Sequence, residues 1–368
     1  ERAETGRIYI MNLDHCNTHS SFKDKVYMSN LCQEITLPTT PVQHIDDKEG
    51  EIALCILSAV NLGLLTDMEE LEELCDLSVR ALDEIIDYQE YPVEAAKISA
   101  QSRRSLGIGY IGLAHYLAKN QVKYEDKKAW KLVDKITEAF QFYLLKASNN
   151  LAKEKTKCLW FEKTKYSDGI LPIDTYKKEL DEIVKRDYTY DWEWLRKEIK
   201  EHGLRHSTLS AQMPSESSSV VSNATNGVEP PRDYLSIKKS KKGPLKQIVP
   251  DYNRLKNFYT LLWDMKGNEG YINIIAVMQK YFDQAISGNW SYNPENYKDG
   301  EVPLSVMAQD LLTTYKLGWK TAYYQNTYDA KSDIDEPVHP VGWHDGVEET
   351  PEEVKKEDDE ENCDACAI

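Results

Sequence analysis

Residues 51–63, EIALCILSAVNLG, and residues 67–88, DMEELEELCDLSVRALDEIIDY, set the architecture that we expect for this chain. The first is a continuous apolar run that ends at a glycine, which is typical of a buried strand. The second has Leu71, Leu74 and Leu82 at helical spacing, which predicts an amphipathic helix. A buried strand followed by a helix is the repeating unit of an α/β protein.

The same alternation continues along the chain. Helical spacing recurs in residues 128–155, 172–184, 190–203, 269–287 and 303–320, whereas short apolar stretches bounded by turn residues occupy 7–12, 34–38, 205–213 and 321–327. We therefore expect an α/β domain over residues 1–328 with a largely parallel sheet. From residue 329 to 368 the periodicity disappears and acids dominate, which predicts a solvated, disordered tail.

The composition excludes several classes of protein. The 368 residues are 41% hydrophobic with a net charge of −17, which is typical of a soluble globular protein and argues against a nucleic-acid surface. Lys and Arg are scattered, apart from a cluster at 238–246. No apolar run approaches the ~18–20 residues that a membrane span needs. Seven widely spaced cysteines indicate reduced, cytoplasmic thiols rather than a disulfide framework.

The chain ends in a cysteine pair, Cys363-x-x-Cys366, behind a run of acids. A zinc site would need a second such pair, and a prenylation signal would need its cysteine fourth from the end. The pair suits reversible disulfide formation, although two idle thiols remain the alternative. A flexible tail of this length spans about 30 Å, so the pair could reach a buried site.

The segment SNLCQEI has Asn30, Cys32 and Glu34 at alternate positions. In an extended segment their side chains would face one space and supply a hydrogen-bonder, a reactive sulfur and an acid/base. The alternative is a short loop with a buried cysteine. Cys55, in its apolar run, is interpreted from composition alone as a core thiol.

A serine-rich turn, MPSESSS, lies between two apolar stretches and is either a phosphate-binding turn at a helix start or an ordinary capped turn. Its candidate residues are Pro214, Ser215, Glu216, Ser217 and Ser218.

Three further motifs have simpler interpretations. GIGYIG, residues 107–112, matches a dinucleotide fingerprint formally but lacks the flanking strand, so we interpret it as close packing at the start of a helix. DHCNTH, residues 14–19, offers three metal-type ligands without a fourth, which favours a hydrogen-bonded strand-end loop; we expect no metal. Tyr323 and Tyr324 are adjacent, and stacking their rings would require a special backbone.

Taken together and in order, SNLCQEI, GEIALCILSA, MPSESSS, SNATNGVEPPR and YYQNT resemble one family, the large catalytic subunit of class I ribonucleotide reductase of the aerobic bacterial and phage kind. The resemblance covers nearly the whole chain before the tail. It implies the C-terminal part of a ten-stranded α/β barrel with additional helices, in which Cys32 lies on a loop threaded through the barrel.

The resemblance also implies a role for each candidate residue. Cys32 becomes a thiyl radical that abstracts the 3′-hydrogen of a ribonucleoside diphosphate, Glu34 takes the 3′-hydroxyl proton, and Asn30 binds the substrate. Cys55 is half of the reducing dithiol. Tyr323 and Tyr324 pass the radical from a small partner subunit, for which a di-iron tyrosyl centre is usual. The serine-rich turn holds the diphosphate, and Cys363 and Cys366 carry electrons from thioredoxin or glutaredoxin.

Two departures from the family shape our expectations. The tail cysteines have two spacers where bacterial relatives often have four, and relatives are about twice this length. We expect this chain to be the C-terminal half of a large subunit, a fragment or a split-gene product that is inactive alone. The N-terminal half would carry the partner thiol of Cys55 and the ATP- and dATP-type effector sites, and the large subunits would form homo-oligomers. The alternatives are a thiol–disulfide oxidoreductase that uses only the tail pair, or a non-catalytic half-barrel.

Overall fold

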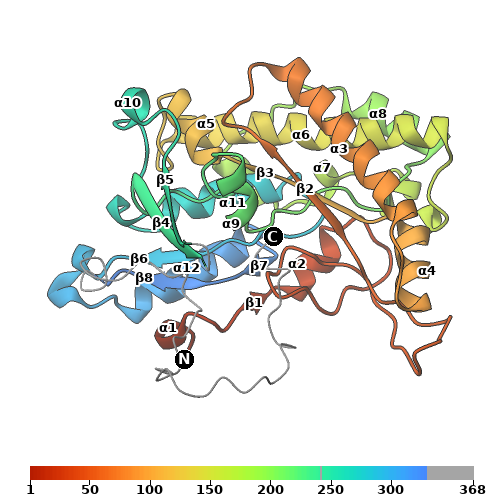
Figure 1. The fold of residues 1–368 in the computed structure, drawn as a ribbon, viewed down its shortest axis with the longest axis horizontal. Coiled ribbons are helices and arrows are strands. Elements are labelled where there is room, and N and C mark those ends of the chain that lie inside the picture. The colour runs from red at the N-terminus through yellow and green to blue at the C-terminus, as the bar shows by residue number, and fades with distance from the viewer. Residues whose placement is uncertain (241–242, 330–368) are drawn as a thin grey trace.

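The computed structural model describes residues 1–240 and 243–329, and it has the mixed α/β architecture that the sequence predicts (Figure 1). The strands are β1 (Ile10–Met11), β2 (Ile56–Asn61), β3 (Leu106–Ile111), β4 (Leu235–Ser240), β5 (Gly243–Ile248), β6 (Trp290–Tyr292), β7 (Thr321–Ala322) and β8 (Gln325–Thr327). The helices are α1 (Arg2–Thr5), α2 (Leu13–Thr18), α3 (Met68–Tyr88), α4 (Glu94–Arg103), α5 (Leu113–Lys119), α6 (Lys127–Glu154), α7 (Pro172–Thr175), α8 (Trp192–His202), α9 (Glu216–Val221), α10 (Tyr252–Leu255), α11 (Glu269–Gln279) and α12 (Leu304–Lys316). Short 3-10 helices are η1 (Phe161–Lys163), η2 (Lys165–Asp168), η3 (Lys178–Glu182), η4 (Leu262–Asp264), η5 (Pro294–Asn296) and η6 (Lys298–Gly300).

The strand pairing is mixed rather than largely parallel. β2 pairs in parallel with β3, from Ile56 opposite Leu106 to Asn61 opposite Ile111, and β6 pairs in parallel with β8. The β1–β7 and β4–β5 pairs are antiparallel. Within the described residues the strands form two-stranded sheets that do not close a barrel.

Isolated parallel β-bridges add two further chain segments beside the β2–β3 pair, so that four segments lie side by side in a row. Ile108 of β3 bridges Ser210, and Gln212 bridges Ile286. The segments around 208–212 and 284–287 therefore lie beside β3 in succession, with their chains running in the same direction. In such a row, the side chains that do chemistry gather at the carboxyl ends of the segments.

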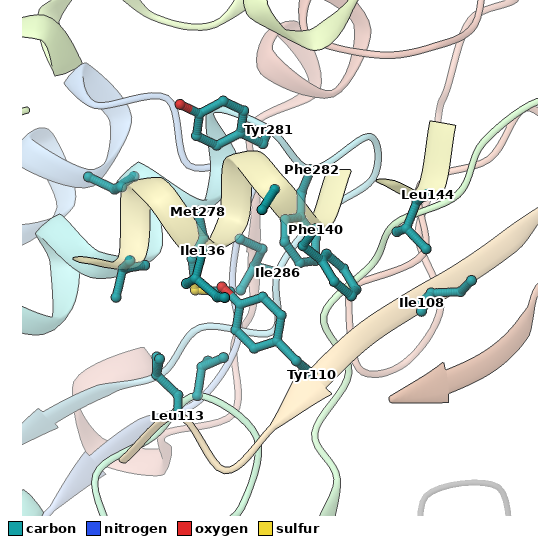
Figure 2. Packing of buried hydrophobic residues seen from close by; sticks show 14 of the residues in the cluster. Ile108, Tyr110, Leu113, Ile136, Phe140, Leu144, Met278, Tyr281, Phe282 and Ile286 are labelled. Atoms are coloured by element: carbon teal, nitrogen blue, oxygen red, sulfur yellow. The ribbon is translucent and has the colours of Figure 1, made fainter. Parts of the chain in front are cut away.

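The long helices cover this row and build the core. α6 packs against α3, α8 and α11, and α3 also contacts β2; in Figure 1, α6 runs nearly horizontally and α3 crosses the same region obliquely. Figure 2 shows Tyr110 of β3 facing Ile136 and Phe140 of α6, with Phe282 beside them. The Tyr110 and Phe140 rings meet edge to face with centroids 5.3 Å apart, a preferred aromatic geometry.

Four long helices agree closely with the sequence prediction, namely α3, α6, α8 and α12. Asp67 caps α3 by accepting from the Glu70 amide, and Gly203 ends α8 with a φ of 77°, a conformation that glycine adopts freely.

The other two predicted helices are wrong in extent. Residues 172–184 form only α7 and η3, because Tyr176 between them is extended, with φ −67° and ψ 160°. The helix predicted over 269–287 ends at Gln279, and the chain beyond it runs along the neighbouring segment. There the Gln284 amide donates to Ser210 O at 3.0 Å and the Ser287 amide to Gln212 O at 2.9 Å. The apolar spacing did not reveal that residues 284–287 leave the helix and pair with residues 210–212.

The strand predictions also need correction. Residues 34–38 form no strand, and residues 205–213 form only the single bridges. GIGYIG is not the start of a helix: Leu106–Ile111 is the fully buried strand β3, and α5 begins after Gly112. The close packing expected of its glycines is confirmed, since a Cβ on Gly109 would lie 2.7 Å from Ala211 O.

Among the helices of the described residues, none has the length and apolar character that crossing a membrane would demand.

Candidate active site

Cys32 lies on a turn rather than on the extended segment that the sequence predicted. The Gln33 amide donates to Asn30 O at 3.2 Å, and Gln33 has a φ of 67°, which reverses the chain locally. The Asn30 side chain stabilises the turn by accepting the Ile35 amide at 3.1 Å. The alternation argument was therefore wrong, and the turn is what directs the Cys32 and Glu34 side chains inward.

The segment 285–287 holds this turn in place. The Ser287 hydroxyl lies 2.5 Å from Cys32 O and 3.3 Å from Glu34 Oε2, and the Ala285 amide donates to Glu34 O at 2.9 Å. Cys32 is 8% exposed and Glu34 only 2%. The thiol and the carboxylate are thus buried and fixed by the same neighbouring segment.

The surroundings of the Glu34 carboxyl shift its pKa upward. Burial raises the pKa of its carboxyl, while hydrogen bonds from Asn30 and Ser287 oppose that shift without cancelling it. A carboxyl group whose pKa moves toward the working pH is better suited to acid–base catalysis than an exposed one.

One tyrosine, Tyr323, contacts the Cys32 thiol, and two further tyrosines pack against Tyr323. The Tyr323 hydroxyl donates to Cys32 Sγ at 3.5 Å, and the Tyr323 and Tyr324 ring centroids are 4.1 Å apart with 50° between the planes. The Tyr9 ring lies 4.6 Å from the Tyr323 ring and 5.3 Å from the Tyr324 ring. The Tyr323 and Tyr324 rings are thus tilted against each other rather than stacked, and they come together at the break between β7 and β8, where residues 323 and 324 belong to neither strand.

The Tyr9 and Tyr323 phenols are neutral at physiological pH. Burial, with hydrogen bonding among the rings, raises the pKa values of Tyr9 and Tyr323 well above the usual phenol value. Oxidation of such a phenol must release its proton together with the electron.

Cys55 lies directly before β2 and contacts Gln284, whose Nε2 donates to its Sγ at 3.5 Å. Burial raises the pKa of the Cys55 thiol to about 12, and the nearby Glu34 charge acts in the same direction. The Cys55 thiol and the Glu34 carboxylate therefore lie within electrostatic range of each other.

The serine-rich turn follows the segment that lies beside 285–287. Ser215 is the N-cap of α9, which begins at Glu216, and its amide donates to Asn226 Oδ1 at 3.0 Å. Asn226 also donates to Glu216 Oε1 at 3.0 Å, which fixes the carboxylate at the helix start. The remaining residues of the turn are Pro214 and Ser217, which are partly buried, and Ser218, which is exposed.

The DHCNTH residues form helix α2 rather than a strand-end loop, and their side chains make structural hydrogen bonds as expected. His15 Nδ1 lies 2.8 Å from Trp319 O, and His19 contacts Thr175 Oγ1 at 2.8 Å and Gln279 O at 2.7 Å. The tail pair, Cys363 and Cys366, lies outside the described residues.

Sequence reasoning missed Tyr9, Gln284 and Ser287. Tyr9 lies in RIYIMN, which we interpreted only as a strand, and the other two lie in DQAIS, which we assigned to a helix. The available signal was that each of these polar side chains interrupts an otherwise apolar stretch. Only the tertiary structure shows which thiol, ring or carbonyl each side chain contacts.

Comparisons with known proteins agree on one family. The family model described as ribonucleotide reductase, barrel domain, matches residues 1–325. The chain is 59% identical to the ribonucleoside-diphosphate reductase subunit alpha of Haemophilus influenzae over 92% of this chain and 45% of that protein. It is 57% identical to ribonucleoside-diphosphate reductase 1 subunit alpha of Escherichia coli over 95% of this chain and 46% of that protein. Its identity to the subunit alpha of Enterobacteria phage T4 is 43% over 91% of this chain and 45% of that protein. The chain thus spans less than half the length of these curated relatives.

Proposed function

The chain belongs to the ribonucleotide reductase barrel-domain family, and on that premise we propose that it forms the radical-bearing half of an active site that converts ribonucleoside diphosphates to 2′-deoxyribonucleoside diphosphates. The observation that carries the proposal is the Tyr323–Cys32 contact of 3.5 Å beside the tilted ring pair of Tyr323 and Tyr324. A phenol in contact with a buried thiol suits transfer of a hydrogen atom.

The reaction begins at Cys32. Its hydrogen atom passes to a Tyr323 radical, and the resulting thiyl radical takes the 3′-hydrogen of the substrate. Glu34 accepts the proton of the 3′-hydroxyl, in keeping with its raised pKa, and the 2′-hydroxyl leaves as water. Asn30, which hydrogen-bonds the Glu34 carboxylate, binds the substrate beside it.

Cys55 supplies the reducing equivalents with a second thiol outside this chain. The two thiols give two electrons and two protons to the substrate radical and become a disulfide. Cys32 then returns its hydrogen atom to the 3′ carbon, and the radical passes back to Tyr323. The chemistry is balanced because the water released and the disulfide formed account for the oxygen and the electrons.

The serine-rich turn is assigned to the diphosphate. One support is its place at the start of α9, because the backbone amides at a helix start attract anions. A second support is that the chain just before the turn, at Gln212, pairs with Ile286 in the segment that also holds the Cys32 turn. Pro214, Ser215, Glu216, Ser217 and Ser218 make up the turn.

The tail cysteines would restore the dithiol after each turnover. Cys363 and Cys366 would reduce the buried disulfide by thiol exchange and then be reduced outside by thioredoxin or glutaredoxin. This exchange requires a reducing compartment, so we place the reaction in the cytoplasm of a bacterial or phage-infected bacterial cell.

Several apolar side chains near the site are exposed. Tyr27, Met28 and Leu31 beside the Cys32 turn are 63%, 58% and 57% exposed, and Leu54, just before β2, and Leu57 on β2 are also exposed. Apolar side chains at a reactive centre need covering. We assign this face to the N-terminal half of the subunit.

The other partners follow from the proposed chemistry. A small subunit, with a di-iron tyrosyl centre as the usual case, would generate the radical, and ATP- and dATP-type effectors would act through the N-terminal half. Large subunits would associate with one another.

The test is a mixing assay. The chain is combined with an N-terminal half, a radical-generating small subunit and dithiothreitol, and deoxynucleotide formation is followed. Cys32→Ser should abolish activity. The double variant Cys363→Ser/Cys366→Ser should keep it, because dithiothreitol bypasses a tail shuttle.

Cys158→Ser is the matched control, since Cys158 is equally buried, at 2% exposed, but lies outside the site. It should retain activity. Activity in the Cys32→Ser variant would refute the thiyl mechanism. Turnover by this chain without an N-terminal half would refute the proposal that it forms only half of the site.

A further inference from the structure

Gln284 is buried with 0% exposure, and every polar atom of its side chain and backbone has a partner in a different part of the chain. Its Nε2 donates to Cys55 Sγ at 3.5 Å and to Leu106 O at 2.9 Å. Its Oε1 accepts the Thr36 amide at 3.1 Å. One side chain thus joins the thiol before β2, the first residue of β3, and the segment that follows Glu34.

The backbone of Gln284 is fixed just as firmly. Its amide donates to Ser210 O at 3.0 Å, and its carbonyl accepts from Gln279 Nε2 and from Lys320 Nζ, both at 2.9 Å. Lys320 is itself buried and also donates to the carbonyls of Phe282 and Asp283. Gln284 therefore cannot turn away from Cys55 without breaking several hydrogen bonds.

We propose that Gln284 is a positioning residue for the reducing thiol, holding Cys55 Sγ in place and stabilising its thiolate through the Nε2 hydrogen bond. The proposal rests on the proposed function for the importance of Cys55, but the hydrogen bond can be tested without turnover.

The chemistry explains why the residue is a glutamine. An amide offers donors for the sulfur and for Leu106 O together with an acceptor for the Thr36 amide. A glutamate would keep the acceptor but lose both donors and add a like charge near the thiolate, and a methionine of similar size would lose all three interactions. A donor to a thiolate favours the charged form, which is the form that attacks a disulfide or leaves one.

The test is alkylation of Cys55 in the full 368-residue chain, followed by mass spectrometry of the peptide that contains it. The rate constant with iodoacetamide is measured from pH 7 to pH 10 for the wild type and Gln284→Met. Loss of one hydrogen bond to the thiolate should slow alkylation of Cys55 by about twofold to tenfold at each pH. A merely structural role predicts the opposite sign, because a loosened site exposes the thiol and speeds alkylation.

Gln141→Met is the matched control. Gln141 is also 0% exposed and its Nε2 donates to Asp283 Oδ1 at 3.0 Å, so the variant perturbs the anchoring of the same segment without touching the thiol. It should leave the Cys55 rate unchanged. Gln284→Glu is the second variant, in case Gln284→Met does not fold, and it should also slow alkylation.

Unchanged or faster alkylation of Cys55 in a folded Gln284 variant would overturn the proposal. Failure of the proposed function gives a different result: the assembled wild-type enzyme would then form no deoxynucleotide, whatever the alkylation rates.

Discussion

Replacing Ser287 with alanine removes a single hydroxyl that meets both Cys32 O, at 2.5 Å, and Glu34 Oε2, at 3.3 Å. Removing the hydroxyl leaves the buried Cys32 carbonyl without this donor, and an unsatisfied buried acceptor costs about 1–3 kcal/mol. We therefore expect Ser287→Ala to lower the free energy of unfolding by about 1–3 kcal/mol.

The same substitution should alter the titration of Glu34. The Ser287 hydroxyl favours the ionised carboxylate, so its loss raises the pKa of Glu34 further. Because Glu34 must be ionised to accept a proton in the proposed reaction, the acid limb of the kcat/KM profile should move to higher pH.

The assay compares pH profiles of deoxynucleotide formation by the assembled enzyme with urea unfolding of the chain. Ser99→Ala is the control, because the buried Ser99 hydroxyl donates to a carboxylate of another residue, Glu51, at 3.2 Å. It should lose similar stability without moving the acid limb. If Ser287→Ala loses stability but its acid limb coincides with that of the wild type, our account of Glu34 is wrong.

Three further predictions concern stability, all measured by urea unfolding. Burial lowers the pKa of His206 to about 4, so folded His206 stays neutral while the unfolded side chain takes up a proton near pH 6.5. Lowering the pH from 7 to 4 should therefore cost up to about 3 kcal/mol, and His206→Gln should flatten that dependence. Gly109→Ala, whose Cβ would lie 2.7 Å from a backbone oxygen, should cost about 1–3 kcal/mol, whereas Gly267→Ala, with open space around it, should change stability by less than about 0.5 kcal/mol. Phe140→Ala should cost about 3–5 kcal/mol, because that ring is fully buried between two other aromatic rings; a cost below about 1 kcal/mol would show that the core relaxes around the loss.

Long elements were predictable from the sequence because their patterns repeat. The helix α3 carries enough turns of apolar spacing to specify its buried face, and its N-cap Asp67 marks the start. Residues 172–184 show the limit, since a short pattern that fits one helix also fits two pieces separated by an extended Tyr176. The strand β3 was missed because three of the six residues in GIGYIG are glycines, which have low strand propensity. Glycine is needed there because neighbouring segments pack too closely for a Cβ atom.

The sequence by itself determined the chemical inventory: a thiol and a carboxylate two residues apart, a second thiol, a tyrosine pair, and a serine-rich turn. The order of these motifs also pointed to the family. Such features are local, so they can be read from neighbours in the chain.

Only the tertiary structure decided which of these groups meet. Tyr323 reaches Cys32 across 291 residues of sequence, and Gln284 reaches Cys55 across 229. Contacts of this kind depend on the packing of whole segments against one another, and the chain carries no local pattern that encodes them. The turn at Cys32 illustrates the difference: its shape comes from local hydrogen bonds, but its place in the fold depends on hydrogen bonds from a segment more than 250 residues away.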